Sequence, residues 1–286
     1  MGVVAVGVAS FASANGLHNS GITWSSGSAI VGANVDGSGR HVLVPQIADG
    51  EGDPAWTRDG RALAFYGHNS DDVEIHVRWP GTHRRERVLR PDYRSPPFPR
   101  RTYAWITEPT WSPDATRIAV SDSWNGYSAT IRTVSVATNK WTSVTKPRRN
   151  VEDVDPAWSP TGSTIAFARR RYGSPPTLYL AHADGSALRP LTKGRSPAWA
   201  PNGKRLVFAL GGSVYEIRID GRGRARILHG LRNPLVRVSP DGRKLFYTSG
   251  SPPYDVDVWT ADVDGTHQRR VLHHAFIIGI AWRPDS

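Results

Sequence analysis

Three carboxylates occupy matching places along the chain. Asp53, Glu108 and Asp155 each stand shortly before a tryptophan in a recurring, proline-containing sequence. Matching positions in a ring of repeats converge on its axis, so these side chains could share one space and hold a hard cation or a partner's basic group. The alternative is a local turn hydrogen bond for each acid. Ser196 and Asn233 take the equivalent place in the next two repeats, so the acidic set is incomplete.

Aromatic and arginine residues in the longer loops form a second group of candidates. Tyr, Trp and Arg are the residue types enriched at the energetic centres of interfaces. Because variable loops on a rigid scaffold commonly carry binding, we predict a binding face, and loops tolerated without function are the alternative. The candidates are Tyr93, Arg94, Phe98, Arg100, Trp124, Tyr127, Arg171, Tyr172 and Tyr254.

Catalytic signals are weak, and we predict no catalytic residues. No serine has glycine both two residues before and two residues after it, so the nucleophile elbow of serine hydrolases is missing. The sequence has no His-Glu-x-x-His motif and no Gly-rich phosphate loop. Cysteine is absent, which excludes disulfides, thiolate metal sites and a cysteine nucleophile. We expect no cofactor, with a divalent cation in a central channel as the alternative.

The recurring sequence defines the elements that must position these residues. Its most complete copy runs from Asp155 to Phe167 and reads Asp-Pro-Ala-Trp-Ser-Pro-Thr-Gly-Ser-Thr-Ile-Ala-Phe. The residues at the tryptophan position of successive copies are Trp56, Trp111, Trp158, Trp199, Val238 and Trp282. Copies roughly 40 to 55 residues apart, each with several short strands, are typical of propeller blades.

Each unit is predicted to contain four strands. The first ends in the tryptophan, which we expect to pack between neighbouring blades. A Ser-Pro-Asp-Gly turn follows, where proline presets φ and glycine accepts positive φ. The Ile-Ala-Phe run is the second strand, an alternating segment is the third, and an Asp-Gly turn leads to the fourth.

This succession of an aromatic strand, Ser-Pro-Asp-Gly, Ile-Ala-Phe and Asp-Gly-Ser resembles the TolB-type propeller repeat, a relative of the WD-repeat blade. The resemblance covers roughly residues 18 to 286 and implies an all-β, six-bladed β-propeller of four-stranded antiparallel blades. The family's namesake also carries an N-terminal α/β domain that docks on other envelope proteins. We expect the resemblance to concern the blades alone, without that N-terminal domain.

The two ends of the chain are predicted to share one blade. Residues 22–37 match the second and third strands of the unit at 206–221, so the first blade lacks its first strand. The C-terminus supplies a spare first strand ending at Trp282. We therefore predict a ring of six blades, closed by a C-terminal strand that joins the N-terminal blade.

Charge and the N-terminus bear on location and partners. The 286 residues carry a net charge of +11, but the arginines are scattered, and we expect them on solvated edges and predict no nucleic-acid binding. Residues 3–11 are apolar and too short to span a membrane, and Ala12-Ser13-Ala14 has the form of a cleavage site. We predict a signal peptide over residues 1–14, either truncated at its start or weak, and one propeller domain over 15–286. An ordinary strand is the rival interpretation of the apolar run.

These observations favour a non-enzymatic module that binds a protein or peptide, or a glycan, in the periplasm or outside the cell. We expect a monomer without a transmembrane segment. The alternative is a metal-dependent propeller hydrolase, lactonase or lyase that uses the central channel. A cytoplasmic scaffold is the third hypothesis, if the apolar run is not a signal.

Overall fold

A computed structural model describes residues 21–25, 29–45, 51–69, 72–83, 85–91, 105–123, 128–146, 148–251, 253–275 and 279–284. All the regular elements of these residues are β-strands, and they form five sheets. The predicted signal peptide lies outside the described residues.

Four of the sheets have four strands each. The first has the order β24 (Ile280–Arg283), β1 (Gly21–Ser25), β2 (Ala29–Ala33) and β3 (His41–Pro45). The second is β4 (Glu51–Trp56), β5 (Leu63–Asn69), β6 (Asp72–Arg78) and β7 (Arg87–Leu89). The third is β16 (Arg195–Trp199), β17 (Arg205–Leu210), β18 (Ser213–Arg218) and β19 (Ala225–Leu228). The fourth is β20 (Val236–Val238), β21 (Lys244–Ser251), β22 (Asp255–Asp262) and β23 (Arg269–Ala275).

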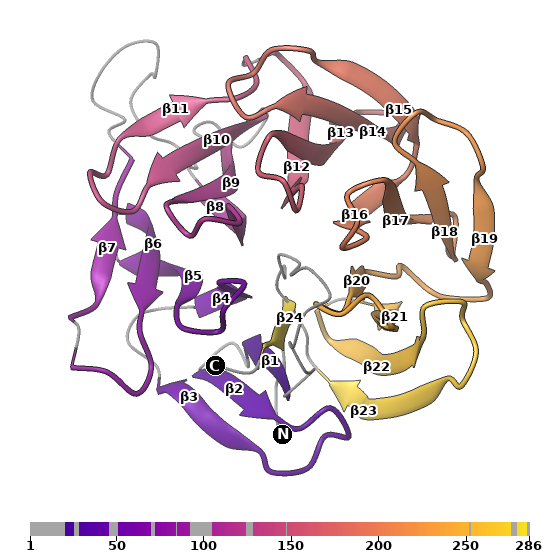
Figure 1. Ribbon diagram of the computed structural model, residues 1–286, viewed down its shortest axis with the longest axis horizontal. Coiled ribbons are helices and arrows are strands. Elements are labelled where there is room, and N and C mark those ends of the chain that lie inside the picture. The colour runs from indigo at the N-terminus through magenta and orange to yellow at the C-terminus, as the bar shows by residue number, and fades with distance from the viewer. Residues whose placement is uncertain are drawn as a thin grey trace.

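The fifth sheet has eight strands and contains two repeat units. Its members are β8 (Trp105–Trp111), β9 (Arg117–Ser123), β10 (Ala129–Ser135), β11 (Trp141–Ser143), β12 (Val151–Trp158), β13 (Thr164–Arg171), β14 (Ser174–His182) and β15 (Arg189–Lys193). Figure 1 shows the sheets arranged around a common axis, with β4, β8, β12, β16 and β20 innermost and the last strand of each unit outermost.

The prediction of a closed ring of six four-stranded blades was wrong. Four separate blades are present, and the residues of two further predicted blades form the one eight-stranded sheet. The cause is that two strands share one edge of β10. The three-residue β11 covers only the stretch from Arg132 to Val134. The eight-residue β12 reaches the uncovered end, where Glu152 pairs in parallel with Ala129.

The C-terminal strand lies beside the first strand of the chain. β24 pairs antiparallel with β1, and Ile22 stands opposite Trp282. All five residues of β1 are buried, as expected for a strand covered on both edges. Two segments far apart in sequence therefore stabilise one sheet.

The Ser-Pro-Asp-Gly turns form as the sequence predicts. In one of them the Ser239 hydroxyl donates to the Asp241 carboxylate at 2.6 Å, and the amide of Gly242 donates to the carbonyl of Ser239 at 2.8 Å. Gly242 has a φ of 76°, a conformation that favours glycine. The short turn fixes the register between the first two strands of its sheet.

The tryptophans of the repeat pack between neighbouring units. Trp56, Trp111, Trp158, Trp199 and Trp282 are at most 1% exposed. The indole N–H of Trp199 donates to the carbonyl of Ala157 on β12 at 3.0 Å, and that of Trp111 donates to Ala55 on β4 at the same distance. Each of these bonds crosses from one inner strand to the preceding one, which supports the predicted packing role.

This packing predicts that Trp199→Phe and Trp158→Phe differ in their free energy of unfolding. Trp199→Phe leaves the buried Ala157 carbonyl without its donor, whereas the indole N–H of Trp158 has no acceptor among the described residues. Both changes remove the same volume, so Trp199→Phe should lower the free energy of unfolding by about 1 to 2 kcal/mol more than Trp158→Phe. Urea denaturation of the two variants measures the difference, and equal losses would contradict the assigned role of the bond.

The expectation that the arginines lie on solvated edges holds only in part. Arg132, Arg169 and Arg237 are at most 6% exposed. Arg169 forms two hydrogen bonds to Asp153, at 2.6 and 2.8 Å, across β12 and β13. Arg132 pairs with Asp122 at 2.7 Å. Because burial strongly disfavours an unpaired charge, each of these two arginines is matched by a buried carboxylate.

Candidate functional site

The innermost strands carry a repeated bulge at the Pro-containing sequence. Asp53, Glu108, Asp155 and Ser196 all have positive φ, between 48° and 58°, and each is followed by a proline. The pairing register of β4, β8, β12 and β16 shifts at these residues. A bulge redirects the side chain at that point of a strand, here toward the neighbouring inner strand.

The redirected side chains link successive inner strands. The amide of Glu108 donates to the Asp53 carboxylate at 3.1 Å, and the amide of Asp155 donates to the Glu108 carboxylate. The amide of Ser196 donates to Asp155 at 2.7 Å. These bonds reach across to the next repeat, so the local turn bond considered as the alternative does not describe them. We call Asp53, Glu108 and Asp155 the axis carboxylates.

Arg237 ends this series at β20. Its guanidinium donates to the Ser196 hydroxyl and to the Val236 carbonyl, both at 2.8 Å. Sequence reasoning missed Arg237, although a signal was present. The residue before the tryptophan position is alanine or threonine in the other copies, and only here is it arginine, beside a valine in place of tryptophan. In this copy valine at 238 is smaller than the usual tryptophan, and arginine at 237 is larger than the usual alanine or threonine.

Burial and mutual charge separate the pKa values of the axis carboxylates. Burial raises the pKa of Asp53 to about 7, against the lowering effects of the Glu108 amide and the Arg237 charge. Burial and the charge of Asp155 raise the pKa of Glu108 well above its usual value. Burial also acts to raise the pKa of Asp155, but the hydrogen bond with Glu108 and the Arg170 charge bring it below the usual value. One proton shared by Glu108 and Asp155 accounts for this opposition.

A pocket of about 530 Å³ lies at the loop end of the eight-stranded sheet. It is lined by Asn150, Glu152, Arg170, Arg171, Tyr172, Ser174 and Pro176. We call it the Tyr172 pocket. Glu152 both lines the pocket and pairs with Ala129, so the pocket adjoins the place where the two repeat units merge. Its volume is in the range of known ligand sites.

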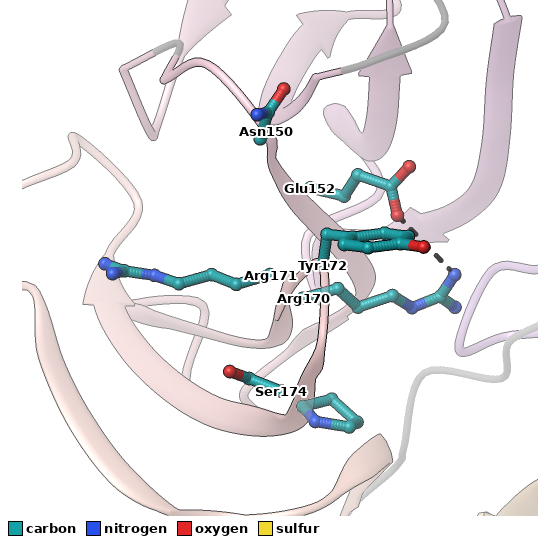
Figure 2. Close-up of a pocket in the computed structure, with 7 residues that line it drawn as sticks. Asn150, Glu152, Arg170, Arg171, Tyr172 and Ser174 are labelled. Carbon is teal, nitrogen blue, oxygen red and sulfur yellow. Dashed lines mark ion pairs between the residues drawn. The ribbon is translucent and has the colours of Figure 1, made fainter.

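Tyr172 is the most exposed large side chain of this region. It is 100% exposed, in the turn between β13 and β14. Figure 2 shows its ring in the middle of the pocket, with Arg170 and Arg171 extending to opposite sides and Glu152 facing Arg170. The Arg170 guanidinium lies 3.8 Å from the Glu152 carboxylate. Aromatic, cationic and polar groups are thus combined in one open site.

The structure places three of the predicted loop residues. Arg171 and Tyr172 lie together in the pocket. Tyr254, 76% exposed, lies in the turn between β21 and β22 of another sheet. The remaining six, Tyr93, Arg94, Phe98, Arg100, Trp124 and Tyr127, lie outside the described residues.

Sequence reasoning missed most of the pocket. Asn150, Glu152 and Arg170 were not singled out as site residues. The signal was the run of three arginines at 169–171 before Tyr172, of which the structure buries Arg169 and exposes Arg170 and Arg171. Among the described residues, no group of three His, Asp or Glu side chains is arranged to hold a metal ion. The described residues also include no helix that could cross a membrane.

Comparisons with known proteins agree with this architecture. A model of the TolB beta propeller domain matches residues 26–285. The chain is 32% identical over 117 residues to a Bacillus subtilis protein called uncharacterized peptidase YuxL, covering 37% of this chain and 17% of that protein. It is 28% identical over 128 residues to uncharacterized protein Atu1656 of Agrobacterium fabrum, covering 41% of this chain and 43% of that one. The crystal structure of TolB from Acinetobacter baumannii matches 92% of this chain and 66% of that chain, with a TM-score of 0.71 and 17% identity.

The length and identity of each match decide whether it shows the fold alone or also the family. The chain spans less than half the length of either curated relative, and the structural match is below 25% identity and shows the fold alone. The family model, in contrast, extends over nearly the whole chain. This chain therefore belongs to the TolB beta propeller domain family.

Proposed function

We propose that this chain is a non-enzymatic binding module that recognises a protein or peptide at the Tyr172 pocket. The observation that carries the proposal is the complete exposure of Tyr172 beside two arginines at an open pocket. Tyrosine brings a large apolar face and a polar tip into an interface with little loss of conformational entropy. Tyr and Arg are also the residue types that dominate binding energy when a partner covers them.

The axis carboxylates support binding over the metal-dependent alternative. Glu108 accepts hydrogen bonds from the Asp155 amide and from the Ser121 hydroxyl, the latter at 2.7 Å. Asp53 and Asp155 each accept an amide of the next inner strand. Oxygens occupied in this way are less available as metal ligands. That the axis carboxylates also contact a partner stays a prediction.

Rigidity of the scaffold supports the same function. Five of the seven lining residues stand on β12, β13 and β14, which are long paired strands of the largest sheet, and Asn150 and Tyr172 directly adjoin the ends of β12 and β13. A preorganised surface loses little conformational entropy when a partner binds.

We include export in the proposal: residues 1–14 act as the signal, and residues 15–286 form the working domain in the periplasm or outside the cell. Recovery of the full chain only from the cytoplasm would contradict export.

The pocket proposal is tested with a random peptide library displayed on phage. Peptides enriched on the wild-type chain are synthesised and titrated by calorimetry against the wild type, Tyr172→Ala and the control Tyr254→Ala. Loss of an interface anchor weakens binding by about 2 kcal/mol, so we expect the Kd to rise at least roughly tenfold for Tyr172→Ala and to stay unchanged for Tyr254→Ala. Failure to enrich any peptide, or equal binding by Tyr172→Ala, would overturn the proposal.

A further inference from the structure

Positive charge surrounds the Tyr172 pocket. Arg170 and Arg171 line it, and Arg148 and Arg149 directly precede its lining residue Asn150. A backbone bond from the amide of residue 151 to the Arg148 carbonyl, 3.2 Å long, closes the turn that carries both. All four arginines are exposed. Among the lining residues that the structure describes, Glu152 is the one carboxylate, so these residues carry an excess of positive charge.

The pairing between Glu152 and Arg170 is weak. Their closest atoms are 3.8 Å apart, whereas charge-assisted hydrogen bonds measure about 2.7 to 2.9 Å. The side chains are 34% and 45% exposed, so water screens their attraction. The neighbouring pair Asp153 and Arg169 is different, with two short bonds and almost complete burial. Arg170 is therefore able to exchange Glu152 for a better-placed carboxylate.

We propose that the partner segment is an acidic peptide, and this inference rests on the proposed function. One carboxylate of the peptide replaces Glu152 at Arg170, and a second pairs with Arg171 on the other side of Tyr172. An apolar side chain between them packs on the Tyr172 ring and on Pro176. Guanidinium groups bind carboxylates through paired N–H donors, which makes two separated arginines selective for a spaced pair of acids.

The lining of the pocket favours a peptide over an acidic polysaccharide. A sugar presents many hydroxyl groups, and it needs acceptor oxygens and amides to satisfy them. Among the described lining residues, the side chains with acceptor oxygens are Glu152, which faces Arg170, and Asn150, Ser174 and the single hydroxyl of Tyr172. Tyr172 and Pro176 instead offer apolar contact, which suits a side chain of a peptide.

The test uses two labelled nonapeptides and fluorescence anisotropy. The first has aspartate and glutamate residues on both sides of a single tryptophan, and the second replaces each acid by its amide. Against the wild type in low salt, we expect the acidic peptide to bind at least about tenfold more tightly than the amide peptide. Raising the salt from about 50 to 200 mM should weaken acidic-peptide binding several-fold.

Two variants are expected to change the affinity for the acidic peptide in opposite directions. This separates an effect on recognition from a general loss of stability, which would only weaken binding. Arg171→Gln should weaken acidic-peptide binding by about tenfold, because it removes one paired carboxylate. Glu152→Gln should strengthen binding about threefold, because it removes a competing and repelling charge. Arg226→Gln, at an exposed arginine on β19, should leave binding unchanged. A purely structural role for Glu152 would not raise affinity.

The outcomes distinguish this inference from the proposed function. If both peptides bind equally, or Arg171→Gln has no effect while Tyr172→Ala still weakens binding, the acidic-peptide inference is wrong and the binding function stands. Polygalacturonate is the probe for the rival ligand, an acidic polysaccharide. If it binds and neither peptide does, the inference is overturned in favour of that ligand. If neither peptide binds and the displayed library yields no peptide, the proposed function fails with it.

Discussion

Asp153→Ala should lower the free energy of unfolding by about 3 to 5 kcal/mol, which is the usual result of leaving a buried charge without its partner. The Asp153 and Arg169 side chains are 1% and 4% exposed. The hydrogen bond with Asp153 raises the pKa of Arg169. A guanidinium is basic enough to stay charged even without such a partner, so Asp153→Ala leaves a buried, unpaired charge. Arg169 also lies 4.5 Å from the centre of the Tyr179 ring, and that contact cannot replace the lost carboxylate.

Urea denaturation near neutral pH measures this loss, and the neighbouring pair provides the control. Glu152 and Arg170 stand one position along the same two strands, opposite each other, but on the exposed side. Glu152→Ala should therefore change stability by less than about 1 kcal/mol. The double variant Asp153→Leu with Arg169→Met should recover most of the stability lost in Asp153→Ala. Similar losses for Asp153→Ala and Glu152→Ala would contradict the role assigned to the buried pair.

Local sequence was enough to predict the strands and their turns. The Ser-Pro-Asp-Gly segments form the expected turns, and the tryptophans pack between units. The merger of two units was not predictable in this way. It depends on β11 being three residues long and on β12 being eight, so that Glu152 reaches Ala129. Strand lengths and long-range register are set by tertiary packing and are the least reliable part of any prediction from local pattern.

For the axis carboxylates, too, the sequence predicted one property and not another. The spacing before the tryptophans correctly selected Asp53, Glu108 and Asp155 as equivalent positions, since all three lie at equivalent bulges. The sequence did not reveal that their carboxylate oxygens accept hydrogen bonds from backbone amides of the next repeat. An acid before proline is compatible with a local turn and with a bulge, and only the neighbouring strand decides between them.

The bulge residue of β4 makes stability depend on pH in an unusual direction. Burial raises the pKa of Asp53 from 3.8 to about 7. A carboxyl whose pKa is raised by folding contributes stability that is complete below pH 3.8 and is lost as the pH rises through about 7. The raised pKa of Glu108 acts in the same direction. The exposed turn acid Asp184 acts in the opposite direction, because hydrogen bonds from Ser186 lower its pKa, and its contribution is lost only as the pH falls below 3.8.

We therefore expect the free energy of unfolding to fall between pH 4.5 and 7.5 by about 3 kcal/mol on account of Asp53. The carboxyl ionises near pH 3.8 in the unfolded chain but only near pH 7 in the folded chain, and between these two values stability falls by up to about 1.4 kcal/mol for each pH unit. Asp53→Asn keeps an acceptor oxygen for the Glu108 amide and removes the titration, so its loss over the same interval should be smaller by that amount. Urea denaturation at several pH values compares the two proteins, with Asp184→Asn as the control whose profile should run parallel to the wild type. Parallel profiles for the wild type and Asp53→Asn would show that Asp53 is ionised throughout this range, and the raised pKa of Asp53 would then be wrong.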